Sequence, residues 1–95
     1  MNELCAIKAT VHGRVQGVFF RATTRKVARE LNLSGTVRNL SGWKKVEVHA
    51  EGEKAQIDKF IEFLKTGPPG AKVEKVDIEW LEFTGGYTGF QVIYE

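Results

Sequence analysis

The chain has 95 residues, 42% of them hydrophobic and 27% charged, which suits one globular domain spanning residues 1–95. Its formal net charge of +2 is too small to indicate a nucleic-acid-binding protein. The single cysteine, Cys5, excludes an internal disulfide. No apolar stretch approaches the roughly 18–20 residues that span a bilayer, and we find no signal peptide. We therefore expect a cytoplasmic protein with no membrane association.

Hydrophobic periodicity predicts five strands and two helices. Alternation with period two indicates strands, and apolar residues at i, i+3, i+4 and i+7 indicate helices. In chain order the expected elements are a strand at 4–12, a helix from about 20 to 31, strands at 35–40 and 45–52, a helix at 53–65, and strands at 72–83 and 90–94. In the strand at 45–52, Glu47, His49 and Glu51 are expected to face outward, away from the valines.

This order of elements predicts an α+β fold. The sequence β-α-β-β-α-β gives a ferredoxin-like split βαβ sandwich, in which two helices cover one face of a mainly antiparallel sheet. Each crossover should be right-handed. The short fifth strand is expected to pair at an edge of the sheet.

The stretch between the first strand and the first helix is a candidate anion site. Gly13 and Gly17 allow a tight bend, because glycine adopts positive φ without steric cost. The helix that follows begins with amide groups that have no intrahelical partner, and its dipole favours a bound anion. Arg21 lies in the first turn, where the dipole disfavours a cation but where a guanidinium could clamp an anion. From the glycine spacing alone, an ordinary turn with a solvated Arg21 is an equally good interpretation.

Most catalytic chemistry finds no support in the sequence. No carboxylate pair is arranged for acid–base work, no cluster has metal-ligand spacing, and no serine or cysteine has an evident base. His12 is interpreted as a strand-end histidine without a catalytic role. An anion cradle with one arginine suits phosphoryl transfer, where catalysis is mainly positioning and electrostatic stabilisation. Asn39 could hold a water molecule, although from the sequence alone a turn-shaping role before Ser41-Gly42 is favoured.

The nine residues Gly13-Arg14-Val15-Gln16-Gly17-Val18-Phe19-Phe20-Arg21 resemble the signature of the acylphosphatase family. Every fixed position of Gly-x-Val-Gln-Gly-Val-x-Phe-Arg is matched. The resemblance continues across nearly the whole chain, in the segments 35–40, 46–52, 67–69, 73–76 and 90–94.

The resemblance implies an enzyme that hydrolyses acyl phosphates to a carboxylate and inorganic phosphate, with neither metal nor cofactor. It implies that Arg21 binds the phosphoryl group and that Asn39 orients the attacking water. The phosphate-binding amides of the family match Val15, Gln16, Gly17, Val18, Phe19 and Phe20. Thr24 resembles a family threonine near the asparagine; support of Asn39 and a plain position on the helix face are equally good interpretations.

Two positions depart from the family pattern. Thr36 stands where an aromatic residue is usual, and the turn after Asn39 is one residue longer, with Trp43 at its tip. We expect this turn to be remodelled.

Two other functions share this fold. One is a ferredoxin-like RNA-binding domain, but outward Glu47 and Glu51 would repel phosphates and the strand at 45–52 has no aromatic stacking motif. The other is a module that binds an acyl phosphate or phosphate without hydrolysing it, as in larger proteins. The absence of a linker or further domain in this chain favours a stand-alone enzyme, and we expect it to be a monomer. We find no second pocket signal for the acyl group, so broad acyl tolerance is expected.

Overall fold

The computed structural model describes residues 3–16, 19–42 and 44–94, and its elements follow the predicted order. The strands are β1 (Leu4–Arg14), β2 (Ser34–Asn39), β3 (Lys45–Glu53), β4 (Lys72–Leu81) and β5 (Phe90–Ile93). The helices are α1 (Phe20–Glu30) and α2 (Lys54–Thr66). Each boundary lies within two residues of the expected one, because the apolar periodicity marks nearly the full length of each element.

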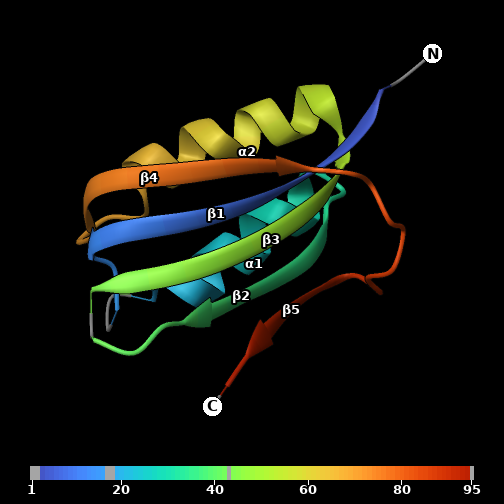
Figure 1. Ribbon diagram of the computed structural model, residues 1–95. Coiled ribbons are helices and arrows are strands. Elements are labelled where there is room, and N and C mark those ends of the chain that lie inside the picture. The colour runs from blue at the N-terminus through green and yellow to red at the C-terminus, as the bar shows by residue number, and fades with distance from the viewer. Residues whose placement is uncertain (1–2, 17–18, 43, 95) are drawn as a thin grey trace.

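One sheet of five strands forms the body of the protein, in the order β4-β1-β3-β2-β5. The pairs β1–β3, β1–β4 and β2–β3 are antiparallel, whereas β5 joins the edge beside β2 in parallel. Figure 1 shows both helices on the same face of this sheet. The predicted ferredoxin-like α+β fold with a short fifth edge strand is confirmed.

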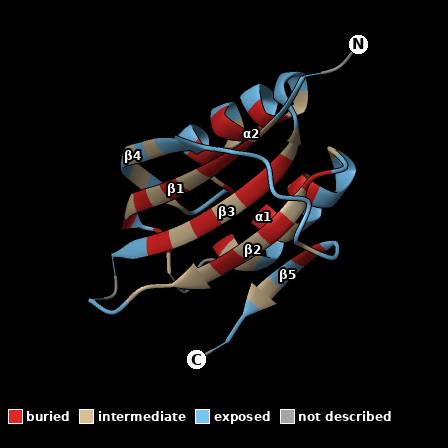
Figure 2. Cartoon of the chain, turned by 45° about the vertical axis from the view of Figure 1, so that its right-hand side comes forward, coloured by how far each residue is buried: buried red, intermediate tan, exposed pale blue. Residues whose placement is uncertain are grey.

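The hydrophobic core lies between the sheet and the two helices (Figure 2). Helix α1 packs against β2 and β5, and α2 against β1, β3 and β4. The largest fully buried side chains are three aromatic rings, those of Phe20, Phe60 and Phe90. The rings of Phe60 and Phe90 meet edge to face with centroids 6.0 Å apart, so the last strand is tied to α2 through the core.

Gly13 fixes the end of β1. The pairing of β1 with β4 shifts by one residue between His12 and Gly13, and Gly13 has a φ of +133°. A Cβ at this position would collide with the carbonyl oxygen of Lys72. Only glycine fits here, so the first glycine of the motif serves the bend that the sequence predicts.

The sequence interpretation was wrong for Glu51. This residue alternates with the core valines as expected, yet only 4% of its surface is exposed. The loop after β4 covers it: the N–H and hydroxyl of Thr84 donate to Oε2 at 3.0 and 2.8 Å, and the N–H of Gly85 donates to Oε1 at 2.9 Å. Local periodicity assigns a residue to a face, but it does not reveal which distant loop covers that face.

Within the described parts of the chain, neither helix is long and apolar enough to cross a membrane.

Candidate active site

The start of α1 presents backbone donors that have no partner among the described residues. The first helical hydrogen bond between described residues runs from the N–H of Thr23 to the carbonyl of Phe19 at 3.0 Å, so the N–H groups of Phe20, Arg21 and Ala22 precede it. No side chain caps this helix start, and its first turn contains no acidic residue. The positive end of the helix dipole is therefore left for an anion from outside the chain.

A pocket of about 270 Å³ opens at this helix start and brings Arg21 and Asn39 together. Its residues belong to the end of the sheet where β1 and β2 finish and β3 begins. This end of the sheet is on the left in Figure 1. The residues that line it are Val15, Phe19, Phe20, Arg21, Ala22, Asn39 and Tyr94. A guanidinium, an amide and an uncapped helix N-terminus thus meet in one place.

Asn39 is held at the last rung of the β2–β3 hairpin, opposite Val46. The N–H of Leu40 donates to the carbonyl of Lys45 at 3.0 Å and closes this end of the ladder. The side-chain amide of Gln16 donates to the carbonyls of both Leu40 and Lys45, at 2.9 Å each. Gln16 therefore ties the loop after β1 to the hairpin that carries Asn39. Trp43, at the tip of the lengthened turn, lies outside the described residues.

The amide oxygen of Asn39 is buried and has no hydrogen-bond partner among the described residues. An unpaired buried acceptor costs about 1–3 kcal/mol, so such atoms are rare unless a ligand or substrate uses them. Thr24 Oγ1 is also buried without a partner, but Thr24 is not among the residues that line the pocket. Of these two atoms, the Asn39 oxygen is the one that belongs to a pocket-lining residue.

Tyr94 is a site residue that the sequence interpretation missed. The guanidinium carbon of Arg21 lies over its ring, 4.8 Å from the centroid, which is cation–π geometry. Arg21 makes no hydrogen bond or ion pair with any other described side chain. A carboxylate in this position would neutralise the charge of the guanidinium. A neutral ring orients the guanidinium and leaves its charge intact. The parallel pairing of β2 with β5 brings Tyr94 here, and no local pattern predicts that pairing.

The structure can be compared with the other predicted phosphate-binding positions. Val15, Phe19 and Phe20 line the pocket as expected. Gln16 lies beside it, and its side chain is engaged in the hairpin contacts. Gly17 and Val18 lie outside the described residues, so their predicted amide contacts stay predictions. His12 lies apart from the pocket, with its ring nitrogen 2.9 Å from a carboxylate oxygen of Asp77 on β4.

Comparison with known proteins decides the family. The family model for acylphosphatase matches residues 7–92. An acylphosphatase of Acaryochloris marina is 45% identical over 93 residues, which cover 98% of each chain. Solved acylphosphatases from Coxiella burnetii and Bacillus subtilis each superpose with a TM-score of 0.90, at 44% and 33% identity. They cover 97% of this chain, and 94% and 100% of theirs.

The chain belongs to the acylphosphatase family. The identities of 37–45% to curated acylphosphatases over nearly the full chain make it an enzyme that hydrolyses acyl phosphates.

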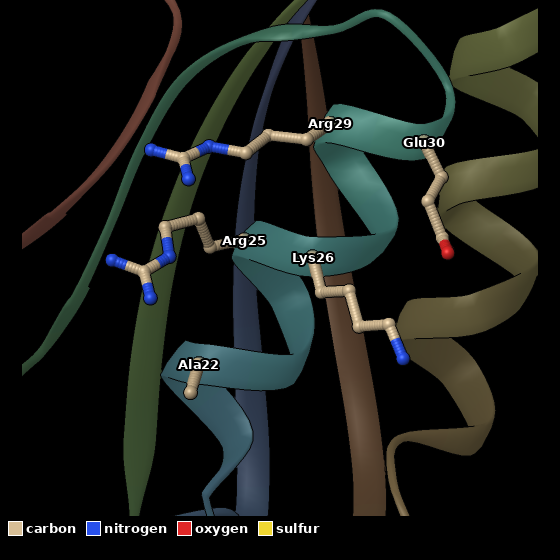
Figure 3. Close-up of a pocket in the computed structure, with 5 residues that line it drawn as sticks. All are labelled: Ala22, Arg25, Lys26, Arg29 and Glu30. Carbon is tan, nitrogen blue, oxygen red and sulfur yellow. The ribbon is translucent and has the colours of Figure 1, made fainter.

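A larger depression of about 570 Å³ runs along the outer surface of α1 (Figure 3). Arg25 and Arg29 extend to one side of the helix there, and Lys26 and Glu30 to the other. Its charged side chains lie beyond the first turn of the helix, and Arg29 donates to the carbonyl of Phe90 at 3.0 Å. The smaller pocket differs from this depression because it combines the start of the helix with the side-chain amide of Asn39.

The open face of the sheet, opposite the helices, carries a charged cluster. Nε of Arg38 donates to a carboxylate oxygen of Glu47 at 3.1 Å, and the ring of His49 lies 3.3 Å from the same oxygen. Burial alone would raise the pKa of Glu47, but the hydrogen bond and charge of Arg38, together with His49, hold this pKa below its ordinary value. Glu47 therefore stays negatively charged at neutral pH on the face where RNA-binding relatives of this fold stack bases.

The described residues contain no group of three or more His, Cys, Asp or Glu side chains that could hold a metal ion. The described lining of the pocket at the start of α1 offers one guanidinium, one amide and one phenol as polar side chains.

Proposed function

We propose that the pocket at the start of α1 hydrolyses the carboxyl–phosphate bond by direct in-line attack of water on phosphorus. The water oxygen bonds to phosphorus as the bridging P–O bond breaks, and the electron pair of that bond leaves with the carboxylate. A proton from the water ends on the released phosphate or in solvent. A carboxylate is a good leaving group, so the reaction requires no strong general acid.

Arg21 is the phosphate clamp in this proposal. Its guanidinium and the free N–H groups at the helix start bind the phosphoryl oxygens of the substrate. The charge on these oxygens is redistributed in the transition state, and donors fixed in advance stabilise it without reorganising. Tyr94 supports this role, because it orients the guanidinium while leaving its positive charge available.

Asn39 positions the nucleophile. Its buried amide oxygen has no protein partner and can accept a hydrogen bond from the attacking water. The presence of Arg21 and Asn39 in one pocket, at an uncapped helix start, is the observation that carries the proposal. An amide does not titrate near neutral pH, so it can hold water in line without acting as a base.

Hydrolysis of benzoyl phosphate in ¹⁸O-labelled water with EDTA tests this mechanism. Attack on phosphorus places one ¹⁸O atom in inorganic phosphate and none in benzoate, and the chelator leaves the rate unchanged. Label in benzoate would mean attack on the carbonyl carbon, and a rate abolished by EDTA would reveal a metal requirement. Binding of phosphate without any turnover would instead indicate a binding module.

We also propose a cytoplasmic monomer that does not bind nucleic acid. The single cysteine suits a reducing compartment. The negatively charged carboxylate of Glu47 on the open face of the sheet disfavours the binding of RNA phosphates. Gel filtration with light scattering tests the oligomeric state.

A further inference from the structure

We infer that Phe19 and Tyr94 form an aromatic rim that contacts the acyl group, so that the enzyme favours substrates with aromatic or other apolar acyl groups. This inference rests on the proposed function and deepens it. It replaces uniform tolerance of acyl groups with a graded preference, set by two side chains at the mouth of the pocket.

The burial of the pocket residues gives the direction in which a substrate lies. Val15 and Phe20 are buried at its base, and Asn39 contributes its buried amide oxygen. Phe19 and Tyr94 are 84% and 74% exposed. A phosphoryl group held by the helix start and Arg21 occupies the inner part of the pocket. The acyl group on the bridging oxygen must then leave through the mouth, past the aromatic rim.

Phe19 has no evident role in folding. Its ring is exposed, and its backbone has φ 59° and ψ 24°, in the left-handed region that is unfavourable for a phenylalanine. It also occupies the N-cap position of α1, where Ser, Asn or Asp would supply a capping side chain. A large apolar residue that buries nothing, in a strained conformation and at a capping position, points to contact with a ligand.

Tyr94 is delivered to the mouth by a firmly anchored strand. Strand β5, which precedes Tyr94, is fixed in three ways. The side chain of Phe90 is buried in the core, the carbonyl of Phe90 accepts a hydrogen bond from Arg29, and β5 pairs in parallel with β2. Arg38 pairs with Ile93 in that register, so Tyr94 follows beside Asn39. Its ring covers the guanidinium of Arg21 and still remains mostly exposed. One ring can therefore orient the arginine and meet the acyl group.

Among the described residues, the pocket lining carries no acidic side chain, and Arg21 is the only charged one. The arginines of the neighbouring depression on α1 lie beyond Ala22, which lines both hollows. An acyl group that leaves the pocket meets the two rings before any second cation, and this order favours an apolar acyl group over an anionic one.

The test compares benzoyl phosphate with acetyl phosphate, whose carboxylate leaving groups have similar acidity. We measure kcat/KM for both in the wild type, Phe19→Asn and Tyr94→Leu, with the inhibition constant of inorganic phosphate as the readout of the phosphate clamp. Asparagine tolerates the left-handed conformation, so Phe19→Asn removes the ring without adding backbone strain. Phe83→Ala removes an exposed ring at the other end of the sheet and serves as the control, and Tyr94→Phe keeps the ring.

The wild type should favour benzoyl phosphate. Each ring-removing variant should lower the benzoyl-to-acetyl ratio of kcat/KM by about three- to tenfold, below the discrimination of an enclosed apolar pocket. The phosphate inhibition constant should change little in Phe19→Asn, and Phe83→Ala and Tyr94→Phe should keep the wild-type ratio.

Several outcomes would overturn the inference. An unchanged ratio in both ring-removing variants would do so, as would an equal loss with both substrates, which would leave Tyr94 only the role of holding Arg21. Faster hydrolysis of succinyl phosphate than of benzoyl phosphate would assign the acyl group to the arginines of α1. Failure of the wild type to hydrolyse any of these compounds would contradict the proposed function itself.

Discussion

A buried polar group lies near each end of strand β3, and the two groups differ in their hydrogen bonding. At one end the carboxylate of Glu51 accepts three hydrogen bonds from Thr84 and Gly85. At the other end Asn39, paired with Val46 near the start of β3, has a buried amide oxygen with no partner among the described residues. The fold completes the bonding of the first group and leaves that of the second unfinished.

The contrast separates a structural polar group from a functional one. A satisfied buried acceptor fixes a loop and stabilises the fold, whereas an unsatisfied one lowers stability until a substrate supplies its partner. Arg21 follows the same division, because it stands at the unfavourable end of a helix dipole and has no carboxylate partner among the described residues. Stability and activity should therefore respond oppositely to mutation at the two ends.

Arg21→Gln should have the largest effect. We expect kcat/KM for benzoyl phosphate to fall by about 10³-fold or more, since an arginine that stabilises a phosphoryl transition state contributes this much in other enzymes. Phosphate inhibition should weaken strongly, while the melting temperature stays level or rises, because a cation is removed from a helix N-terminus. Steady-state kinetics and calorimetry measure both. Wild-type turnover in this variant would remove Arg21 from the mechanism.

Asn39→Ala should affect turnover without affecting phosphate binding. We expect kcat to fall by about 10²- to 10³-fold, comparable to the loss of one positioned donor in other active sites. The phosphate inhibition constant should stay within about twofold, and unfolding in urea should change by no more than about 1 kcal/mol. Normal turnover would mean that the hairpin carries Asn39 only for its turn geometry.

Glu51→Ala should give the reverse pattern. Removing the carboxylate leaves the N–H groups of Thr84 and Gly85 without their acceptor, so the free energy of unfolding should fall by about 1–3 kcal/mol. For a domain of this size, each kcal/mol lowers the melting temperature by about 4–8 °C. The kcat per folded molecule should remain at the wild-type level. Thr84→Val, which removes only the hydroxyl bond, is the milder matched variant.

An outcome in which Glu51→Ala loses activity at full stability would break the comparison, because it would mean that the far end of the sheet takes part in catalysis.

Different parts of the molecule were predictable to different degrees. The two helices and the antiparallel strands follow from apolar periodicity. The family signature indicates Arg21 as a candidate, and the matching segment 35–40 indicates Asn39. Tyr94 and Glu51 could not be predicted, because each owes its environment to a contact between segments far apart in the chain. Tyr94 depends on the parallel pairing of β5 with β2, and Glu51 on the loop that crosses it. Periodicity describes one segment at a time. It therefore predicts helices, strands and their buried sides, but not the contacts between segments far apart in the chain.

The parallel pairing of β5 also has a kinetic consequence. The described lining of the pocket comes from positions 15, 19–22, 39 and 94, so the pocket is complete only when the last strand is docked beside β2. Contacts between such distant segments are slow to form, because the entropy of closing long loops is lost first. The site is therefore complete only in the fully folded chain, and a partly folded chain with β5 undocked would lack the ring of Tyr94 beside Arg21.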